Sequence, residues 1–136
     1  MAPTKAALFI ALPLALCACG RDQNLYGHWE GDRDWRTLGQ PSEEVARALA
    51  AINLDLKSDD SFVLTDGGVP FTGTWYQTGD GIALQVQTIL NRPLEIQSEN
   101  TKKAADFTVR YANGNLYFRS TADKVEIELK KKTKRG

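Results

Sequence analysis

Few side chains of this 136-residue chain are suited to catalysis or to tight metal binding. It has one histidine, His28, and two cysteines, Cys17 and Cys19. A Ser-His-Asp arrangement or a zinc site would have to be built around His28, beside Trp29. Successive residues of a β-strand face opposite sides, so an inward Trp29 would place His28 on the surface. We therefore expect no catalytic residue, no metal site and no cofactor, and a protein that is not an enzyme.

The carboxylates form short local groups. Asp32 and Asp34 flank Arg33, and three further aspartates, Asp55, Asp59 and Asp60, lie at a strand end and the turn after it. A calcium loop needs ligands at alternating positions followed by a bidentate glutamate, and neither group has that pattern. A cation site at residues 32–34 stays open as an alternative, but we expect a solvated loop with local ion pairs.

The first residues have the organisation of a secretory signal. Lys5 provides a basic start, residues 6–16 are apolar, and small residues precede a cysteine. The apolar part through Ala18 is 13 residues long, whereas a helix needs about 20 to cross the hydrocarbon of a bilayer. A transmembrane anchor is therefore disfavoured.

Leu16, Ala18 and Cys19 resemble a bacterial lipobox. The resemblance implies a signal peptide at 1–18 and acyl chains, palmitate among them, on Cys19. It further implies a lipoprotein anchored in the bacterial cell envelope. Gly20 stands where an aspartate commonly retains lipoproteins in the inner membrane, so in a Gram-negative host the outer membrane, facing the periplasm, is implied. Two alternatives stay open: cleavage after Gly20, and modification of Cys17, which the bulky Leu16 disfavours.

The charge is balanced overall but unevenly distributed. Residues 19–129 contain 11 basic and 17 acidic side chains, a net of about −6, which argues against a nucleic-acid surface. Five basic residues lie between positions 130 and 135. This tail is either a solvated terminus or a contact for anionic lipid headgroups.

One segment has helical periodicity. After the N-cap candidate Ser42, apolar residues recur at i, i+3, i+4 and i+7, namely Val45, Ala48, Leu49 and Ile52. A helix of about three turns is too short to be stable alone, so we expect this stripe to pack on the rest of the domain and to cover one of its ends.

The remainder of the chain has a period of two. Apolar residues alternate with polar ones from Leu54 to Leu129, between short turns such as Asn113-Gly114, which favours a hairpin. Expected strands include Leu94–Ile96 and Val125–Leu129, whereas Ser98–Ala105 is expected to be a polar loop. We predict a mainly β protein: a small antiparallel up-and-down β-barrel of about eight strands, with one short helix between the first two strands.

The order of the motifs resembles small lipocalin-like domains of bacterial envelope lipoproteins. Gly27-His28-Trp29 opens the domain and Gly73-Thr74-Trp75 follows two strands later. The resemblance covers most of residues 26–130 and implies a barrel with Trp29 packed at its closed end. We therefore expect a barrel domain at 26–130, preceded by a lipidated tether at 19–25, which the lipobox implies, and followed by a basic tail at 131–136. The early helix departs from true lipocalins, whose helix lies near the C-terminus, and the family brings no established activity.

Two functions follow as hypotheses. The first is a non-catalytic binding or interaction module, tethered to the membrane through Cys19, that meets an unknown envelope protein. The alternative is a carrier of a small apolar ligand inside the barrel, with Trp29 or Trp75 stacking on it. We expect little room for such a ligand, because five large aromatic side chains are available to fill the interior: Phe62, Phe71, Trp75, Phe107 and Phe118.

Overall fold

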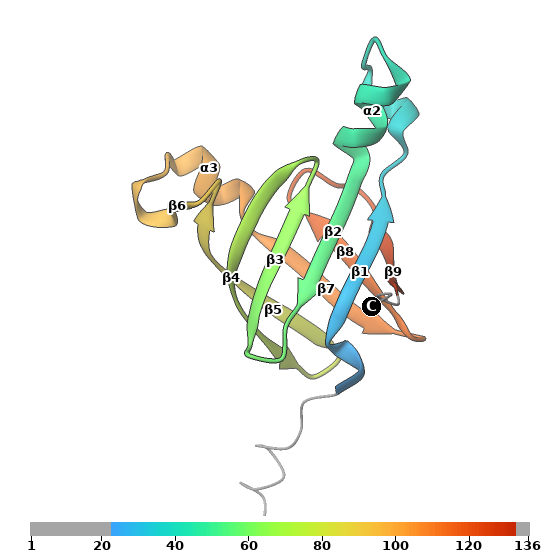
Figure 1. Cartoon of the computed structure of the whole chain (residues 1–136). Helices are drawn as coiled ribbons and strands as arrows, with labels where there is room; N and C mark the ends of the chain where they lie inside the picture. Colours follow the sequence, from blue (N-terminus) through green and yellow to red (C-terminus); the bar gives the residue numbers. More distant parts are fainter. Residues whose placement is uncertain (1–22, 133–136) are drawn as a thin grey trace, which may run out of the picture.

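Eight antiparallel strands close into a barrel in the computed structural model, which describes residues 23–132 (Figure 1). Each strand pairs with its neighbours in the chain, and β1 pairs with β9 to close the circle, as an up-and-down barrel requires. The predicted fold class is confirmed. The strands are β1 (Gly27–Asp32), β2 (Ala51–Leu56), β3 (Ser61–Asp66), β4 (Val69–Thr78), β5 (Gly81–Ile89), β7 (Phe107–Ala112), β8 (Asn115–Ser120) and β9 (Ile127–Lys132).

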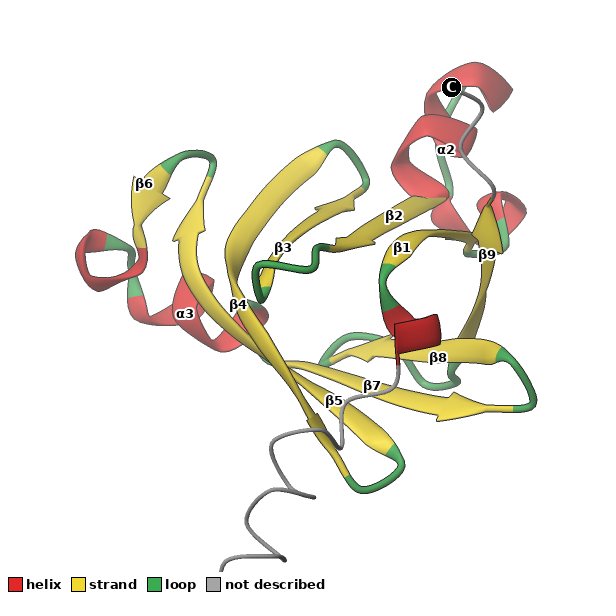
Figure 2. Ribbon diagram, turned by 60° about the horizontal axis from the view of Figure 1, so that its bottom comes forward, coloured by secondary structure: helices red, strands yellow, loops and turns green. Residues whose placement is uncertain are grey.

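The up-and-down order gathers the connections at two ends of the barrel, here called the near end, where β1 begins, and the far end, where β1 finishes. The near end carries the 3-10 turn η1 (Gln23–Leu25) and the β2–β3, β4–β5 and β7–β8 turns (Figure 2). The far end carries η2 (Trp35–Leu38), α2 (Glu43–Ala50), β6 (Arg92–Pro93), η3 (Leu94–Ile96) and α3 (Glu99–Ala104).

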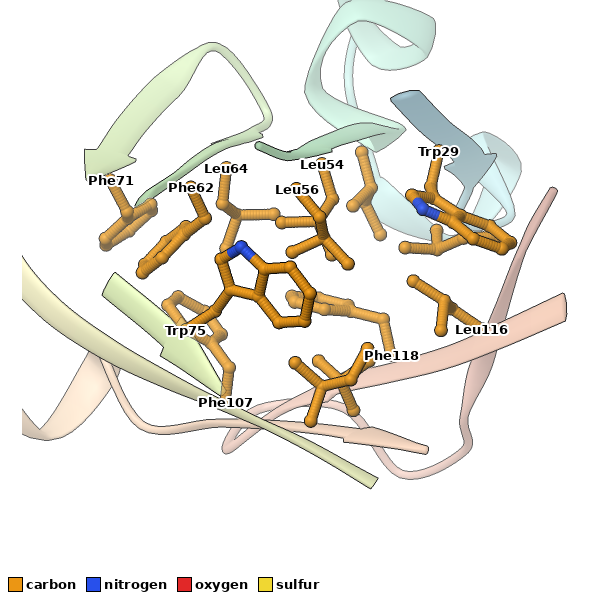
Figure 3. Packing of buried hydrophobic residues seen from close by; sticks show 14 of the residues in the cluster. Trp29, Leu54, Leu56, Phe62, Leu64, Phe71, Trp75, Phe107, Leu116 and Phe118 are labelled. Carbon is orange, nitrogen blue, oxygen red and sulfur yellow. The ribbon is translucent and has the colours of Figure 1, made fainter. Parts of the chain in front are cut away.

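Buried aromatic and aliphatic side chains fill the interior (Figure 3). Trp29 and Trp75 are 1% exposed and Phe118 is fully buried. Phe107 packs edge-on against Phe71, with ring centroids 4.9 Å apart, and lies 5.4 Å from Phe118. The five aromatic residues expected to point inward all do so, which confirms the prediction of a filled core.

The two tryptophans also close the near end. The Trp29 Nε1–H donates to the carbonyl oxygen of Leu25 at 3.0 Å, and the Leu25 side chain is fully buried. The Trp75 Nε1–H donates to the carbonyl oxygen of Lys57 at 3.1 Å, which holds the β2–β3 turn. The Tyr26 ring packs edge-on against Trp75, with centroids 5.7 Å apart. The chain therefore joins the barrel at Leu25, within the segment expected as a tether.

The barrel wall is incomplete at the far end. β5 pairs with β7 only through Gly81↔Arg110 and Ile82↔Val109, both near the opposite end. Beyond them β5 pairs with the two-residue β6, and the η3–α3 segment follows. The predicted strand at Leu94–Ile96 and the predicted loop at Ser98–Ala105 are both wrong. Pro93 lacks the N–H that a longer β6 would need, and the Ser98 hydroxyl caps α3 by accepting from the Thr101 N–H.

Helix α2 begins as predicted but is shorter. The Ser42 hydroxyl accepts from the Val45 N–H at 3.2 Å. The helix ends at Ala50, because Ala51 is extended, with φ −72° and ψ 138°, and begins β2. Ile52 therefore belongs to a strand, where its side chain is buried.

The expected packing of the α2 stripe is wrong. Val45 is 46% and Leu49 40% exposed, while the helix buries only the small side chains of Ala46 and Ala50. The Arg47 guanidinium lies 4.7 Å from the ring centroid of Trp35 and joins α2 to η2. Figure 1 shows the helix extending beyond the ends of β1 and β2 instead of lying across the barrel.

The last strand differs slightly from the expected one. Val125 is 71% exposed and precedes β9, which continues to Lys132, two residues into the segment expected as a tail. Among residues 23–132, no helix is long and apolar enough to cross a membrane.

Gly73 lies on β4 at a point where the backbone of β5 leaves no room for a side chain. The register of the two strands shifts between Thr72 and Gly73, and a Cβ at position 73 would overlap the carbonyl oxygen of Gln85. Both strands would have to move apart to admit a side chain, so this glycine is required by space and not by its backbone angles.

Gly73→Ala is predicted to lower the free energy of unfolding by about 3 kcal/mol, because a methyl group at this position overpacks the β4–β5 pair. Urea denaturation measures the change. Thr74→Ala, at the next position of the same strand, is the control and should change the value by about 0.5 kcal/mol or less. Equal effects of the two substitutions would contradict the close approach.

Candidate functional site

His28 lies on the outer face of β1, as the inward position of its neighbour Trp29 predicts. Its side chain is 20% exposed and is held between two carboxylates. The Nδ1 atom lies 2.6 Å from Asp55 Oδ1 on β2, and the Nε2 atom lies 2.8 Å from Glu30 Oε2 on β1. Both ring nitrogens are therefore engaged.

This arrangement favours the charged imidazolium. Burial lowers the pKa of His28, but the hydrogen bonds to Asp55 and Glu30 outweigh it and raise the pKa above its ordinary value of 6.5. An imidazolium that donates from both nitrogens has no lone pair to accept a proton from a nucleophile. The geometry fits a structural ion pair across β1 and β2 better than a general base.

Two of the aspartates singled out in the sequence, Asp34 and Asp59, form local contacts. Asp34 Oδ1 accepts from the backbone N–H and from the Nε–H of Arg36, each at 3.1 Å, and so caps η2. Asp59 Oδ1 accepts from the Ser61 hydroxyl at 2.6 Å and from the Ser61 N–H at 3.0 Å. These hydrogen bonds lower the pKa of Asp34 and of Asp59. Between residues 23 and 132, no group of three or more histidine, cysteine, aspartate or glutamate side chains is placed to hold a metal ion.

Arg33 takes part in a bridge that the sequence did not reveal. Its guanidinium donates to both oxygens of Asp66, the last residue of β3, and to both oxygens of Asp123, in the β8–β9 loop. The bonds to Asp123 measure 2.8 and 3.0 Å, and the guanidinium carbon lies 5.9 Å from the ring centroid of Phe118. The bridge therefore joins the segment after β1, the end of β3 and the β8–β9 loop over the far end of the core.

Electrostatics in the bridge favour the ionised carboxylate. Burial raises the pKa of Asp123, but hydrogen bonds from Arg33 and from Ser120 prevail and lower it to about 2. The hydrogen bond to Asp123 is the main cause that raises the pKa of Arg33, which stays charged. The guanidinium has both carboxylates as partners, so the bridge is a closure of the barrel and not a vacant anion site.

An open depression of about 400 Å³ lies beside the bridge. Phe71 and Phe107 form its floor, each 8% exposed, and Arg33, Asp66 and Asp123 line one wall. It lies on the side where β5 and β7 separate. Two residues of the core, Phe71 and Phe107, therefore contribute to the lining of this depression.

Exposed apolar side chains concentrate at the far end. Six large ones are exposed among residues 23–132, and only Tyr76 belongs to the final residues of β4, toward the near end. The other five lie on far-end connections: Val45, Leu49, Leu90, Ile96 and Val125. Exposed apolar surface of this kind often marks a contact with another molecule.

The candidate residues from the sequence thus have different outcomes. Cys19, the proposed lipid-attachment residue, lies outside the described residues, as does the signal segment. The helical spacing of Val45 and Leu49 correctly predicted a helix with both residues on one face, but that face is exposed and does not contact the core. The partners of Arg33 had no local signal, because Asp66 and Asp123 are 33 and 90 residues away.

Comparison with known proteins gives no match to a family model, to a curated protein sequence or to a solved structure. The likeness to lipocalin-like domains therefore rests on architecture, which is a closed eight-stranded antiparallel barrel. It assigns no activity to the residues described above.

Asp123→Asn is predicted to lower stability at neutral pH by about 1 kcal/mol, less than the full pKa shift implies because the bridge is partly hydrated. A lowered folded-state pKa stabilises the protein above the unfolded-state value near 3.8, and this contribution is lost as pH falls toward about 2. Urea denaturation across that range should show the two proteins converging.

Asp106→Asn is the matched control, because Asp106 is an exposed carboxylate beside the start of β7 at the same end. A constant difference between the Asp123 variant and the native protein from pH 7 to pH 2 would contradict the role of the Arg33 bridge.

Proposed function

We propose that the protein is an envelope lipoprotein that is anchored through acyl chains on Cys19 and acts as a non-catalytic interaction module. The lipobox-like run supports the anchor, and the entry of the chain into the barrel at Leu25 is compatible with it. The lipocalin-like barrel would then be a rigid support for its far end. In this proposal Cys19 has a single role, which is membrane attachment.

The observation that carries the proposal is the separation of the two ends. The described chain begins at Gln23 beside the near end, whereas five exposed apolar side chains lie at the far end. A protein tethered by its N-terminus would present these side chains away from its own membrane. The α2 stripe of Val45 and Leu49, supported by the Arg47–Trp35 contact, is our candidate surface for an envelope protein partner.

A carrier of a small apolar ligand is the second candidate. The far-end depression with Phe71 and Phe107 favours it, because it leads toward the core where β5 and β7 separate. The filled interior opposes it, since the core residues are 8% exposed or less and a ligand would have to displace them. We therefore place the interaction module first.

Cys19→Ser is predicted to release the protein from the membrane, because acyl chains are the proposed anchor and no helix among residues 23–132 is long and apolar enough to replace them. Fractionation of host cells with mass spectrometry of the N-terminal peptide measures attachment and acylation together. A variant that stays processed and membrane-bound like the native protein would contradict the anchor. Cys17→Ser is the control and should leave both unchanged.

Val45→Gln combined with Leu49→Gln is predicted to lower the ratio of the complex with the envelope partner to the free monomer at least tenfold in solubilised envelopes. Both side chains are exposed, so each substitution should cost about 0.5 kcal/mol or less in stability. Native gel electrophoresis of gently solubilised envelopes measures the distribution. Tyr76→Gln removes an apolar side chain that is 44% exposed toward the near end and is the matched control.

The surface assignment would be contradicted if both variants retained the complex equally. It would also be contradicted if the native protein formed no complex larger than itself.

A further inference from the structure

A surface groove of about 630 Å³ lies at the near end of the barrel, along β1, β2 and β9. It is separate from the far-end surface proposed above. Lysines from the β2–β3 turn and from β9 line it, and apolar atoms form most of its surface. The groove is lined by Gly27, His28, Asp55, Leu56, Lys57, Lys131 and Lys132.

The buried tryptophans fix two of these lysines. The Trp75 Nε1–H holds the carbonyl oxygen of Lys57 at 3.1 Å, so the lysine backbone is anchored to the core. The Lys131 ammonium lies 5.7 Å from the ring centroid of Trp29 and donates to the carbonyl oxygen of Asn24 at 2.7 Å. An ammonium has three donors, so Lys131 keeps two others for a further acceptor.

The charge of the groove is positive. The lining contains three lysines and one carboxylate, Asp55, whose Oδ1 atom already contacts His28 at 2.6 Å. Glu30 contacts the other nitrogen of the same imidazole at 2.8 Å. Both of these carboxylates are thus paired with His28. Asp59, in the β2–β3 turn, interacts electrostatically with Lys57, and the ammonium groups of the three lysines provide the donors that an anion needs.

The distance to the acylated residue is bounded by chain length. Gln23 is four positions after Cys19, and a fully extended chain spans at most about 14 Å over four such steps. If Cys19 carries the membrane anchor, the near end must remain within about that distance of the headgroups. This step rests on the proposed function.

We propose that this lysine groove binds the phosphate of an anionic phospholipid headgroup in the membrane to which the protein is tethered. The three ammonium groups complement the phosphate, and the apolar stems of the lysines contact the glycerol and upper acyl region. A soluble phosphate would use the ammonium groups alone, so the largely apolar lining of the groove favours a lipid. The headgroup contact would orient the barrel with its near end toward the bilayer.

The experiment measures lysine acetylation of the lipidated full chain in nanodiscs by mass spectrometry. One set of discs contains phosphatidylcholine only, and the other contains one part phosphatidylglycerol to two parts phosphatidylcholine. Anionic lipid is expected to slow acetylation of Lys57, Lys131 and Lys132 about tenfold. This is the scale expected when each lysine near an anionic surface strengthens binding to it about fivefold. Lys102, Lys103 and Lys124, at the far end, are internal controls and should not change.

Variants separate the site from general charge. Lys57→Gln combined with Lys132→Gln should restore nearly all of the acetylation of Lys131 in anionic discs. Lys102→Gln combined with Lys124→Gln removes the same charge at the far end and should leave the protection intact. Lys131 is unsubstituted in both variants, so its contacts with Trp29 and Asn24 are kept.

Three results would overturn the assignment of the groove as a lipid site. They are equal slowing of acetylation at both ends of the barrel, no slowing in anionic discs, or the same slowing in neutral discs on adding inorganic phosphate. The last would identify a free-phosphate site. If Cys19 proves to be unmodified, the proposed function fails, and the footprint is measured with vesicles of the same two compositions. The groove still predicts protection of the same three lysines there, and its absence would overturn the groove by itself.

Discussion

The hydrogen bond from the Trp29 indole to the Leu25 carbonyl oxygen determines where the chain joins the barrel. It fixes η1 against the near end, while the same ring packs in the core and lies beneath the Lys131 ammonium. One buried side chain therefore connects the N-terminal approach, the interior and the last strand. The buried Leu25 side chain, the Tyr26–Trp75 ring contact and the hydrogen bond from Lys131 to the Asn24 carbonyl oxygen hold the same segment.

The two ends of the barrel differ in chemistry because different constraints apply to them. Trp29 and Trp75 close the near end and donate hydrogen bonds to backbone carbonyl oxygens there. The Trp75 bond holds the backbone of Lys57 in place. At the far end, β5 leaves β7, and the Arg33 bridge joins the loops over Phe118 instead of a further layer of core. The connections at that end consequently carry exposed apolar side chains. In the function proposed above, the basic end faces the membrane and the apolar end faces the partner.

Strands were predictable from sequence because each one buries a single face, and a period of two records that burial directly. The hairpin at Asn113-Gly114 was equally local, since both residues have positive φ, 55° and 82°. The α2 stripe shows the limit. Amphipathic spacing reveals that Val45 and Leu49 share a face, but the partner of that face depends on where Ala51 redirects the chain. The Arg33 bridge depends on closure of the whole barrel, and acylation of Cys19 depends on processing that no packing pattern records.

In the proposed orientation, the near end of the barrel faces the membrane and α2 is the element farthest from it. Paramagnetic broadening of backbone amide signals by gadolinium-chelating headgroups, measured on the lipidated chain in nanodiscs, tests this orientation directly. The account predicts strong broadening in the near-end turns at Ser58, Gly79 and Gly114, and little at Ala48 in α2. Stronger broadening at Ala48 than at the three turns would mean that the apolar end contacts the bilayer, and would contradict the account.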